Sequence, residues 1–470
     1  MGKEGSSLPG KALDKYGNHD VPGYDRWHYR MVFTIMNRLT DANKLYDGGT
    51  HAMDGSKFKY GTQLFEMNHL LETAKLQRDL LAGTYEPGPG NKFPISERGH
   101  RRYITSAKMR DKALNHTLCD EVIMPAISKY VIYDNSSSQK GRGVSHHRKR
   151  TEVHLHQYFM EYGTNEGWGL LIDFSGYYPN MMHDIDKAIL NDVTRRSGYF
   201  TEEELTLAEQ LVDKIFKSME LDVSRFSDEE IERMYHSKVD PEINVGVPKR
   251  LLTGEKMLKK GVDIGNQLSQ GSGIIHAYPV DNYCKIVAGC HYYARYTDDI
   301  RIFHPNKDFL LGVLESVRII SAKLGLIINE KKTRLFKLSK HFKHLQVDYQ
   351  LANTGKVYRR ISSKSMTRER RKLKKYKKKL EEGTMPYEDI ENAFKSWLGG
   401  HWKLMTRRQI GNMADLYFQL YGRRPTWKKK HGRLRWLMEH SSQISASTAT
   451  TTSQGRKSPR KCSRTTTSQS

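Results

Sequence analysis

With 470 residues, 37% of them hydrophobic and 10% aromatic, the chain is long enough for two or three domains with sizeable cores. Lysine and arginine outnumber aspartate and glutamate by 78 to 53, and the net charge of +25 favours a polyanionic partner over a solvated basic surface. No apolar run is long enough to cross a membrane and no signal peptide is recognisable, so we expect a cytoplasmic protein that does not bind membranes.

The four cysteines predict neither disulfides nor a zinc site. Cys119, Cys284, Cys290 and Cys462 form no Cys-x-x-Cys pair and no regular cysteine–histidine spacing. Such usage is typical of a reduced cytoplasm. Cys284 and the Cys290-His291 pair are therefore interpreted as core residues rather than as metal ligands.

The first third of the chain is predicted to be mainly helical. Residues 1–60 are polar and aromatic-rich and give no clear pattern. Apolar residues at helical spacing predict a helix over 62–82. A basic stretch at 92–110 contains an extended segment, 103–105, and a second helix is predicted at 108–130.

Two apolar segments in the middle of the chain are predicted to be buried strands. Residues 168–172 form a short apolar run that ends at Asp173. Residues 292–296 and 300–303 are strand-like and flank the polar turn 297–299, which predicts a β-hairpin.

The remaining segments are predicted to be helical or unstructured. Residues 184–240 are charged and helical in pattern, and 308–324 form an amphipathic helix. A basic helix is predicted over 359–379. Beyond about residue 441 the chain is Ser/Thr-rich with basic residues and no acid, which predicts a disordered tail.

Acidic residues follow both predicted strand segments. Asp298 and Asp299 lie at the hairpin turn, where a plain turn would be the simplest explanation, because aspartate is common in turns. Asp173 ends the other strand, and neighbouring strands lie about 4.8 Å apart. Strand ends side by side would bring Asp173 and Asp298 close enough to share divalent cations.

These residues resemble the catalytic boxes of reverse transcriptases. Residues 296–299, Tyr-Thr-Asp-Asp, resemble the Tyr-x-Asp-Asp box, and 173–179, Asp-Phe-Ser-Gly-Tyr-Tyr-Pro, resemble the first catalytic box. Residues 264–270, Ile-Gly-Asn-Gln-Leu-Ser-Gln, resemble the nucleotide-binding box between them. Its Ile-Gly start, where most intron and retroviral enzymes have Gln-Gly, resembles the reverse transcriptases of diversity-generating retroelements.

Further segments resemble the same group, and some features depart from it. Residues 83–89, 102–107 and 110–112 look like fingers motifs, as do 134–136 followed by 140–143, and 324–326 with Asn329 and 332–333 look like the next palm motif. The stretch from the first acid to the nucleotide-binding box is longer than expected, which indicates an insertion at 186–250. A zinc-type endonuclease segment and the Val-Thr-Gly signature of retron enzymes are both missing from the sequence.

The resemblance implies a role for each matching residue. Asp173 and Asp298 would be metal ligands for two Mg²⁺ ions, with Mn²⁺ as an alternative, and Asp299 would be the second acid of its box. Tyr178 would be a steric gate against ribonucleotides, although an aromatic there is otherwise plain core. The other implied contacts are Arg102, Ile264, Gly265 and Lys332 with the nucleotide, and Lys374, Lys375, Lys377 and Lys378 with duplex phosphates.

The resemblance also implies a fold. The class would be α+β, as a right-hand polymerase with fingers, an antiparallel-sheet palm and a helical thumb. The implied boundaries are an N-terminal extension at 1–60, fingers at 61–165, a palm at 166–345, a thumb at 346–440 and a tail at 441–470.

The implied function is RNA-directed DNA synthesis by a bacterial or phage type of reverse transcriptase. Its partners would be an RNA template, a DNA or RNA primer and dNTPs, with a non-coding RNA or an accessory protein as further candidates. The setting would be a diversity-generating retroelement or a phage-defence system. Two rival functions remain: an RNA-directed RNA polymerase, which also places paired acids on a hairpin, and a non-catalytic RNA-binding scaffold, which would need none of the acids.

Overall fold

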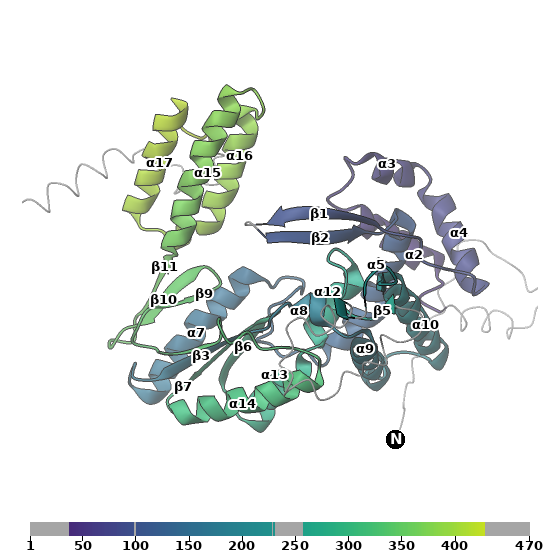
Figure 1. Cartoon of the computed structure of the whole chain (residues 1–470), viewed down its shortest axis with the longest axis horizontal. Helices are drawn as coiled ribbons and strands as arrows, with labels where there is room; N and C mark the ends of the chain where they lie inside the picture. The colour runs from purple at the N-terminus through teal and green to yellow at the C-terminus, as the bar shows by residue number, and fades with distance from the viewer. Residues whose placement is uncertain (1–36, 98–99, 228, 231–256, 428–470) are drawn as a thin grey trace, which may run out of the picture. The chain divides into compact units, whose positions relative to one another are not determined.

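The computed structural model describes residues 37–97, 100–227, 229–230 and 257–427 (Figure 1). These residues form helices and antiparallel sheets, so the predicted α+β class is confirmed. The described helices include none that is long and apolar enough to span a membrane. The chain divides into two compact units, which are described separately below.

The first unit comprises residues up to 129 together with 187–220 and 262–271. Its main elements are α2 (Ala42–Met53), α3 (Tyr60–Met67), α4 (His69–Leu81), β1 (Asn91–Glu97), β2 (His100–Ser106), α5 (Met109–Leu118), η1 (Cys119–Ile123), α6 (Met124–Ser128) and α10 (Glu202–Met219). Strands β1 and β2 pair as an antiparallel hairpin, which confirms the extended segment predicted at 103–105. Helix α5 continues through the π-helical turn η1 into α6, in agreement with the helix predicted at 108–130.

The single helix predicted over 62–82 is wrong, because the chain breaks at Asn68 into α3 and α4. Asn68 has φ −111° and ψ 15°, outside the helical region, and its side-chain amide donates to the carbonyl of Leu64 at 3.0 Å. Such local side-chain bonds compete with the helical ladder. The break redirects the second helix, so Leu76 and Leu80 are buried whereas Leu70 is exposed.

Helices α2 and α5 pack unusually closely because a glycine lies at their contact. A Cβ atom placed on Gly48 would lie 2.1 Å from Thr117 Oγ1 and 2.7 Å from the carbonyl oxygen of Ala113. The Thr117 hydroxyl also reaches the carbonyl oxygen of Lys44 across the contact, at 3.3 Å. Any larger residue at position 48 would force the two helices apart.

The second unit comprises residues 130–186 and 221–261 and everything from 272 onwards. Its central sheet has the strand order β6-β7-β3-β8, with all neighbours antiparallel. The elements around this sheet are α7 (Val144–Tyr162), β3 (Trp168–Asp173), α8 (Tyr177–Asn180), α13 (Tyr278–Asn282), η3 (Tyr283–Val287), β6 (Tyr292–Tyr296), β7 (Asp299–His304), α14 (Lys307–Lys323) and β8 (Arg334–Lys337). The predicted strand, hairpin and amphipathic helix at 308–324 are therefore confirmed.

Helices pack against β3 and β7, which explains why the middle of each strand is mostly apolar. Helix α7 contacts β6 and β7, and α14 contacts β3 and β7. Paired residues of the two strands, such as Leu170 opposite Ile302 and Ile172 opposite Ile300, are fully buried. Strands covered in this way need no polar face.

The C-terminal part of this unit holds a second sheet, of order β11-β10-β9, and three helices. Its elements are β9 (Phe342–His344), β10 (Val347–Leu351), β11 (Val357–Ile361), α15 (Ser363–Glu381), α16 (Tyr387–His401), η4 (Trp402–Leu404) and α17 (Arg407–Tyr421). Leu373, Phe394, Leu398 and Tyr417 are buried together where the three helices meet. The basic helix predicted over 359–379 starts too early, because residues 357–361 pair with β10 as a strand.

The remaining described elements lie in the region of the predicted insertion and of the nucleotide-binding box. They are α9 (His183–Ser197), β4 (Leu221–Asp222), β5 (Met257–Leu258) and α12 (Gln267–Ile275). Helices α9 and α10 agree with the helical pattern predicted at 184–240 up to residue 219. Residues 231–256, the first 36 residues and the predicted tail lie outside the described residues, and the predicted fingers, palm and thumb boundaries stay predictions.

Candidate active site

Acidic residues meet where β3 ends and β7 begins. Asp173, the last residue of β3, lies directly opposite Asp299, the first residue of β7. Asp298 precedes β7 in the hairpin turn, and its carbonyl oxygen accepts a 3.3 Å hydrogen bond from the amide of Phe174. The expected adjacency of the two strand ends is therefore present in the structure.

The turn that carries Asp298 has an uncommon backbone conformation and is held from two sides. Thr297 has φ +56°, in the left-handed region that β-branched residues rarely adopt. Its amide donates to the hydroxyl of Ser137, and its own hydroxyl lies 3.2 Å from the same oxygen. On the other side, Arg295 Nη1 donates to the Thr297 carbonyl at 3.1 Å.

Arg295 is itself fixed by a buried ion pair. The side chain is fully buried, and its guanidinium donates to the Asp281 carboxylate at 2.8 Å from Nε and 2.7 Å from Nη2. The same guanidinium donates to the carbonyl of Ile274 at 2.7 Å, and the hydroxyl of Tyr293 donates to Asp281 at 2.5 Å. The hairpin turn is therefore anchored to the interior of this unit.

The acids repel one another, and a lysine offsets part of that repulsion. Burial, followed by the Asp298 and Asp173 carboxylates, raises the pKa of Asp299 to about 7. Lys332 Nζ lies 3.0 and 2.9 Å from the two carboxylate oxygens of Asp173 and acts against this shift. The ammonium group thus neutralises one of the three carboxylates.

The donor set fits a hard divalent cation. Magnesium prefers carboxylate oxygens, and a cation would relieve the repulsion that, after burial, contributes to the raised pKa of Asp299. The three acids are not yet convergent: among the described residues, they do not form a group whose ligand atoms all lie within 4.8 Å of one another. Asp173, which Lys332 contacts here, would be one of the three residues that hold such an ion.

Tyr178 lies close to the acids. It belongs to the short helix α8, is half-buried, and its pKa is raised to about 12 by burial and then by the Asp298 carboxylate. A Cβ atom on Gly273 would lie 2.3 Å from the Tyr178 hydroxyl, so the ring packs directly over this glycine. Tyr178, Lys332 and the acids thus belong to one unit, and the steric-gate role stays a prediction.

The other predicted nucleotide contacts belong to the first unit. Arg102 is a residue of β2, where its backbone pairs with Ile95. Ile264 is half-buried, and Gly265 has φ +107°, a conformation that favours glycine. Gly265 also lines a cavity of about 260 Å³ together with Asp111, Lys112, Asn115, Asn266, Gln267 and Gln270. These three residues therefore belong to a different unit from the acids.

The four predicted phosphate-binding lysines lie on α15. Lys374, Lys375 and Lys378 are exposed, whereas Lys377 is half-buried and pairs with Glu381 at 3.2 Å. Leu373 on the same helix is fully buried against α16 and α17. The helix thus buries an apolar side and presents its lysines to solvent.

Sequence reasoning missed the residues that support the hairpin turn. Ser137 and Asp281 belong to no recognisable motif. Ser137 contacts Thr297 across 160 residues of sequence, and Asp281 acts through Arg295, which lies 14 residues away from it. Arg295 offered a signal, because a charged residue inside the apolar run Tyr-Tyr-Ala-Arg-Tyr must find a partner when it is buried. That partner is Asp281.

The raised pKa of Asp299 predicts a pH-dependent cost to stability in the metal-free protein. This loss in the free energy of unfolding is absent below about pH 3.8, grows as the pH rises, and is complete above about pH 7. It arises because Asp299 binds its proton more tightly in the folded state than in the unfolded state. Asp299→Asn should therefore stabilise the protein increasingly from pH 4 to pH 8, by at most about 4 kcal/mol for a shift of this size. Urea unfolding in EDTA measures it, with Asp308→Asn on the exposed start of α14 as control. A gain that is independent of pH would contradict the assignment.

Comparisons with known proteins give structural similarities of low score. No protein-family model and no curated protein matches the chain. The telomerase from Candida albicans in complex with the TWJ fragment of telomeric RNA aligns over 80% of this chain and 68% of its own, with 11% identity and a TM-score of 0.40. The apo telomerase from Candida tropicalis aligns over 58% of this chain and 48% of its own, with 16% identity and a TM-score of 0.38. Its form truncated from the C-terminal domain aligns over 60% and 59%, with 13% identity and a TM-score of 0.36. Such scores and identities assign neither fold nor activity, so the inference below rests on the acids and their surroundings.

Proposed function

We propose that the chain is an RNA-directed DNA polymerase that extends a primer on an RNA template. The observation that supports this most strongly is the pairing of Asp173 with Asp299, beside Asp298, at the ends of antiparallel strands. Three acids in one partly buried place are costly, as the raised pKa of Asp299 shows. A non-catalytic RNA-binding scaffold would gain nothing from holding three acids together at this cost in free energy.

The proposed reaction is the attack of a primer 3′-hydroxyl on the α-phosphate of a dNTP, with pyrophosphate as the leaving group. Asp173, Asp298 and Asp299 would hold two Mg²⁺ ions, or Mn²⁺ in their place. When bound, such ions lower the pKa of the attacking hydroxyl and stabilise charge on the leaving group.

Two further residues of the same unit have proposed roles. Lys332, which lies against Asp173, would become free to contact a phosphate or to protonate the pyrophosphate once the carboxylate takes another partner. Tyr178 would place its ring where the 2′-hydroxyl of a ribonucleotide projects, and Gly273 allows the ring to lie deep because it has no side chain. Arg102, Ile264 and Gly265 keep their predicted role as nucleotide contacts.

Primer extension on a defined RNA template tests the function directly. Purified full-length protein should extend a labelled primer with dNTPs and far less with rNTPs. Efficient extension with rNTPs alone would favour the RNA-directed RNA polymerase. Tight RNA binding without extension, under any combination of Mg²⁺ and Mn²⁺, would favour the scaffold.

Removing the Tyr178 ring should relax the choice of sugar. Tyr178→Ala is expected to raise rNTP efficiency relative to dNTP efficiency by about 10- to 100-fold, the range for removing a steric contact in a pocket. Gly273→Ala keeps the ring but displaces it, since the new methyl group would lie 2.3 Å from the hydroxyl, and should also change the ratio. Tyr199→Ala, at an exposed aromatic of the first unit, is the control. An unchanged ratio in both variants would make Tyr178 a packing residue.

Neutralising the α15 lysines should weaken template–primer binding and reduce its salt dependence. Each lost phosphate contact lowers the log–log slope by about 0.9 for B-form DNA. We expect Lys374→Gln, Lys375→Gln and Lys378→Gln to account for most of the change, because Lys377 is already paired with Glu381. As a control, a triple lysine-to-glutamine variant at Lys307, Lys323 and Lys340, which are all exposed and lie outside α15, removes the same amount of charge. Equal slopes for the two triple variants would mean that α15 carries no specific phosphate contacts.

The biological setting is proposed as a phage-defence system or a diversity-generating retroelement, in which a non-coding RNA or an accessory protein would be a further partner. Ile264 bears on the choice, because glutamine at this place could hydrogen-bond the nascent pair whereas isoleucine offers only apolar contact. Sequencing the cDNA made in cells separates the two settings. Errors concentrated at template adenines favour the retroelement, and rare, uniform errors favour defence.

A further inference from the structure

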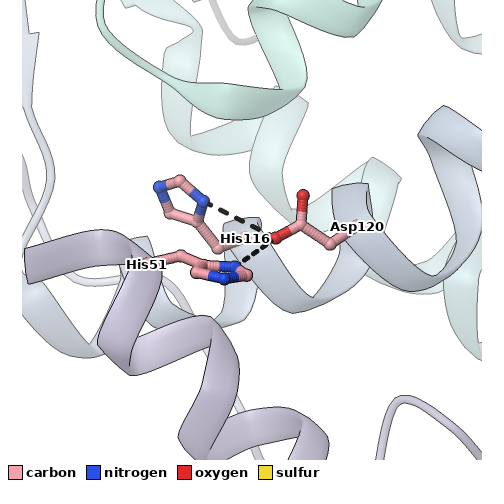
Figure 2. A group of neighbouring side chains, drawn as sticks. All are labelled: His51, His116 and Asp120. Carbon is pink, nitrogen blue, oxygen red and sulfur yellow. Dashed lines mark hydrogen bonds and ion pairs between the residues drawn. The ribbon is translucent and has the colours of Figure 1, made fainter. Parts of the chain in front are cut away.

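Two histidines and an aspartate that have no part in the proposed polymerase reaction converge in the first unit (Figure 2). His51 comes from α2, His116 from α5 and Asp120 from the π-helical turn η1. Asp120 Oδ2 lies 2.8 Å from His51 Nδ1 and 4.0 Å from His116 Nδ1. Each of the three residues offers one atom that could bind a metal ion, and these three atoms all lie within 4.8 Å of one another.

The convergence is built into rigid structure rather than into a loop. His116 and Asp120 are four residues apart, so they lie on one side of consecutive helical turns. His51 lies one turn beyond Gly48, the residue at which α2 touches Thr117 of α5. The close helix contact therefore fixes the distance across which the ligands meet.

Hydrogen bonding explains only part of this arrangement. His51 and Asp120 make a normal hydrogen bond, but 4.0 Å is too long for a second one to His116. Within the described part of the chain, the imidazole of His116 makes no hydrogen bond. Two imidazoles thus face one carboxylate that bonds only one of them.

We propose that His51, His116 and Asp120 form a binding site for one divalent transition-metal ion of the zinc class. Imidazole nitrogen and carboxylate oxygen are ligands for Zn²⁺, whereas Mg²⁺ prefers oxygen alone. Bonds of about 2.0–2.2 Å in a tetrahedral site separate ligand atoms by about 3.3–3.6 Å. The 2.8 Å distance must open and the 4.0 Å distance must close by about half an ångström each, which small side-chain rotations achieve.

The surroundings leave a position for a fourth ligand. His51 and Asp120 are exposed, so water can reach the ion. Asp54, which ends α2, lines the 260 Å³ cavity together with His116, and its charge acts on that imidazole. Water or the Asp54 carboxylate would complete the site.

The proposed ion would tie α2 to α5 and would act separately from the polymerase chemistry. Its binding should raise the melting temperature, because a ligand that binds only the folded state stabilises that state. Neither this effect nor the binding requires a template, a primer or a nucleotide. Failure of the polymerase proposal would therefore leave the metal site untouched, and the reverse also holds.

Zn²⁺ binding to the full chain tests the proposal. The measurement uses competition for Zn²⁺ with a chromogenic chelator, with enough Mg²⁺ present to occupy carboxylate-only sites. The protein carries Asp298→Asn, which weakens the acid cluster. One Zn²⁺ per chain is expected, and His51→Ala, His116→Gln and Asp120→Asn should each weaken binding by at least about 10-fold. Co²⁺ in place of Zn²⁺ should give visible absorption that the same variants abolish.

A matched control is available in the second unit. His341 is exposed and lies beside the buried Asp348, with 3.7 Å between Nδ1 and Oδ1, and among the described residues no second histidine completes the pair. His341→Ala should leave Zn²⁺ affinity and the Zn²⁺-dependent rise in melting temperature unchanged. Circular dichroism confirms that the variants fold, and exposed His51 and Asp120 should tolerate substitution. Unchanged Zn²⁺ affinity in folded His51→Ala and Asp120→Asn proteins, or equal losses in His341→Ala, would overturn the proposal.

Discussion

Asp173→Ala and Asp298→Asn are each expected to lower the rate of primer extension by about 10³-fold or more while leaving RNA affinity within about 2-fold of the wild type. The loss is large because charge stabilisation at the reacting phosphate is worth several kcal/mol, and each 1.36 kcal/mol is about 10-fold in rate. RNA affinity should hold because the basic surface that attracts phosphates is unchanged. Single-turnover extension and filter binding on the same template measure the two quantities.

The control for these variants is Asp308→Asn, which removes one negative charge from the exposed first turn of α14. It should extend primers at the wild-type rate. Extension near that rate by Asp173→Ala or Asp298→Asn would remove the acids from the mechanism. A parallel loss of RNA binding would instead show that the substitutions disturb the fold.

Asp281→Ala is expected to lower the free energy of unfolding by about 3–5 kcal/mol, the cost of leaving a buried charge without its partner. Arg295 is fully buried and donates hydrogen bonds from two nitrogens to Asp281. When the carboxylate is removed, water cannot replace it as the acceptor. The hydroxyl of Tyr293 loses its acceptor as well. Urea unfolding at pH 7 measures the change.

An exposed ion pair provides the comparison for this prediction. Arg196 and Asp192 are four residues apart on α9 and lie 3.0 Å from each other at the surface. Asp192→Ala should cost less than about 0.5 kcal/mol, as exposed helical pairs do. If both substitutions cost the same, Arg295 is hydrated and the hairpin turn is not anchored by a buried charge.

Local patterns predicted those parts of the fold in which neighbours in sequence are also neighbours in structure. The apolar run before Asp173, the hairpin around Thr297 and the helix over 308–324 all follow from the spacing of apolar residues. The adjacency of Asp173 and Asp298 followed from the same reasoning, since acids at the ends of two buried strands need a shared explanation. Their catalytic role stays a prediction.

The structural features that the sequence did not predict depend on contacts between residues that are distant in the chain. The strand β11 replaces the start of the predicted basic helix because residues 357–361 find a partner in β10. The pairing of Arg295 with Asp281 depends on a fold that no local spacing encodes. The same holds for His51, which meets Asp120 across 69 residues of sequence, so that a search for short ligand spacings finds only His116 and Asp120.

The left-handed backbone of Thr297 has a consequence for how the acids reach their places. A β-branched residue in this conformation costs roughly 1–2 kcal/mol. Contacts from Ser137 and Arg295 offset the cost, and all of them form within the protein itself. The apex of the hairpin is therefore preorganised: the energy needed to position Asp298 is spent once, during folding. In the proposed polymerase, no part of it would have to be supplied by the binding of each successive nucleotide.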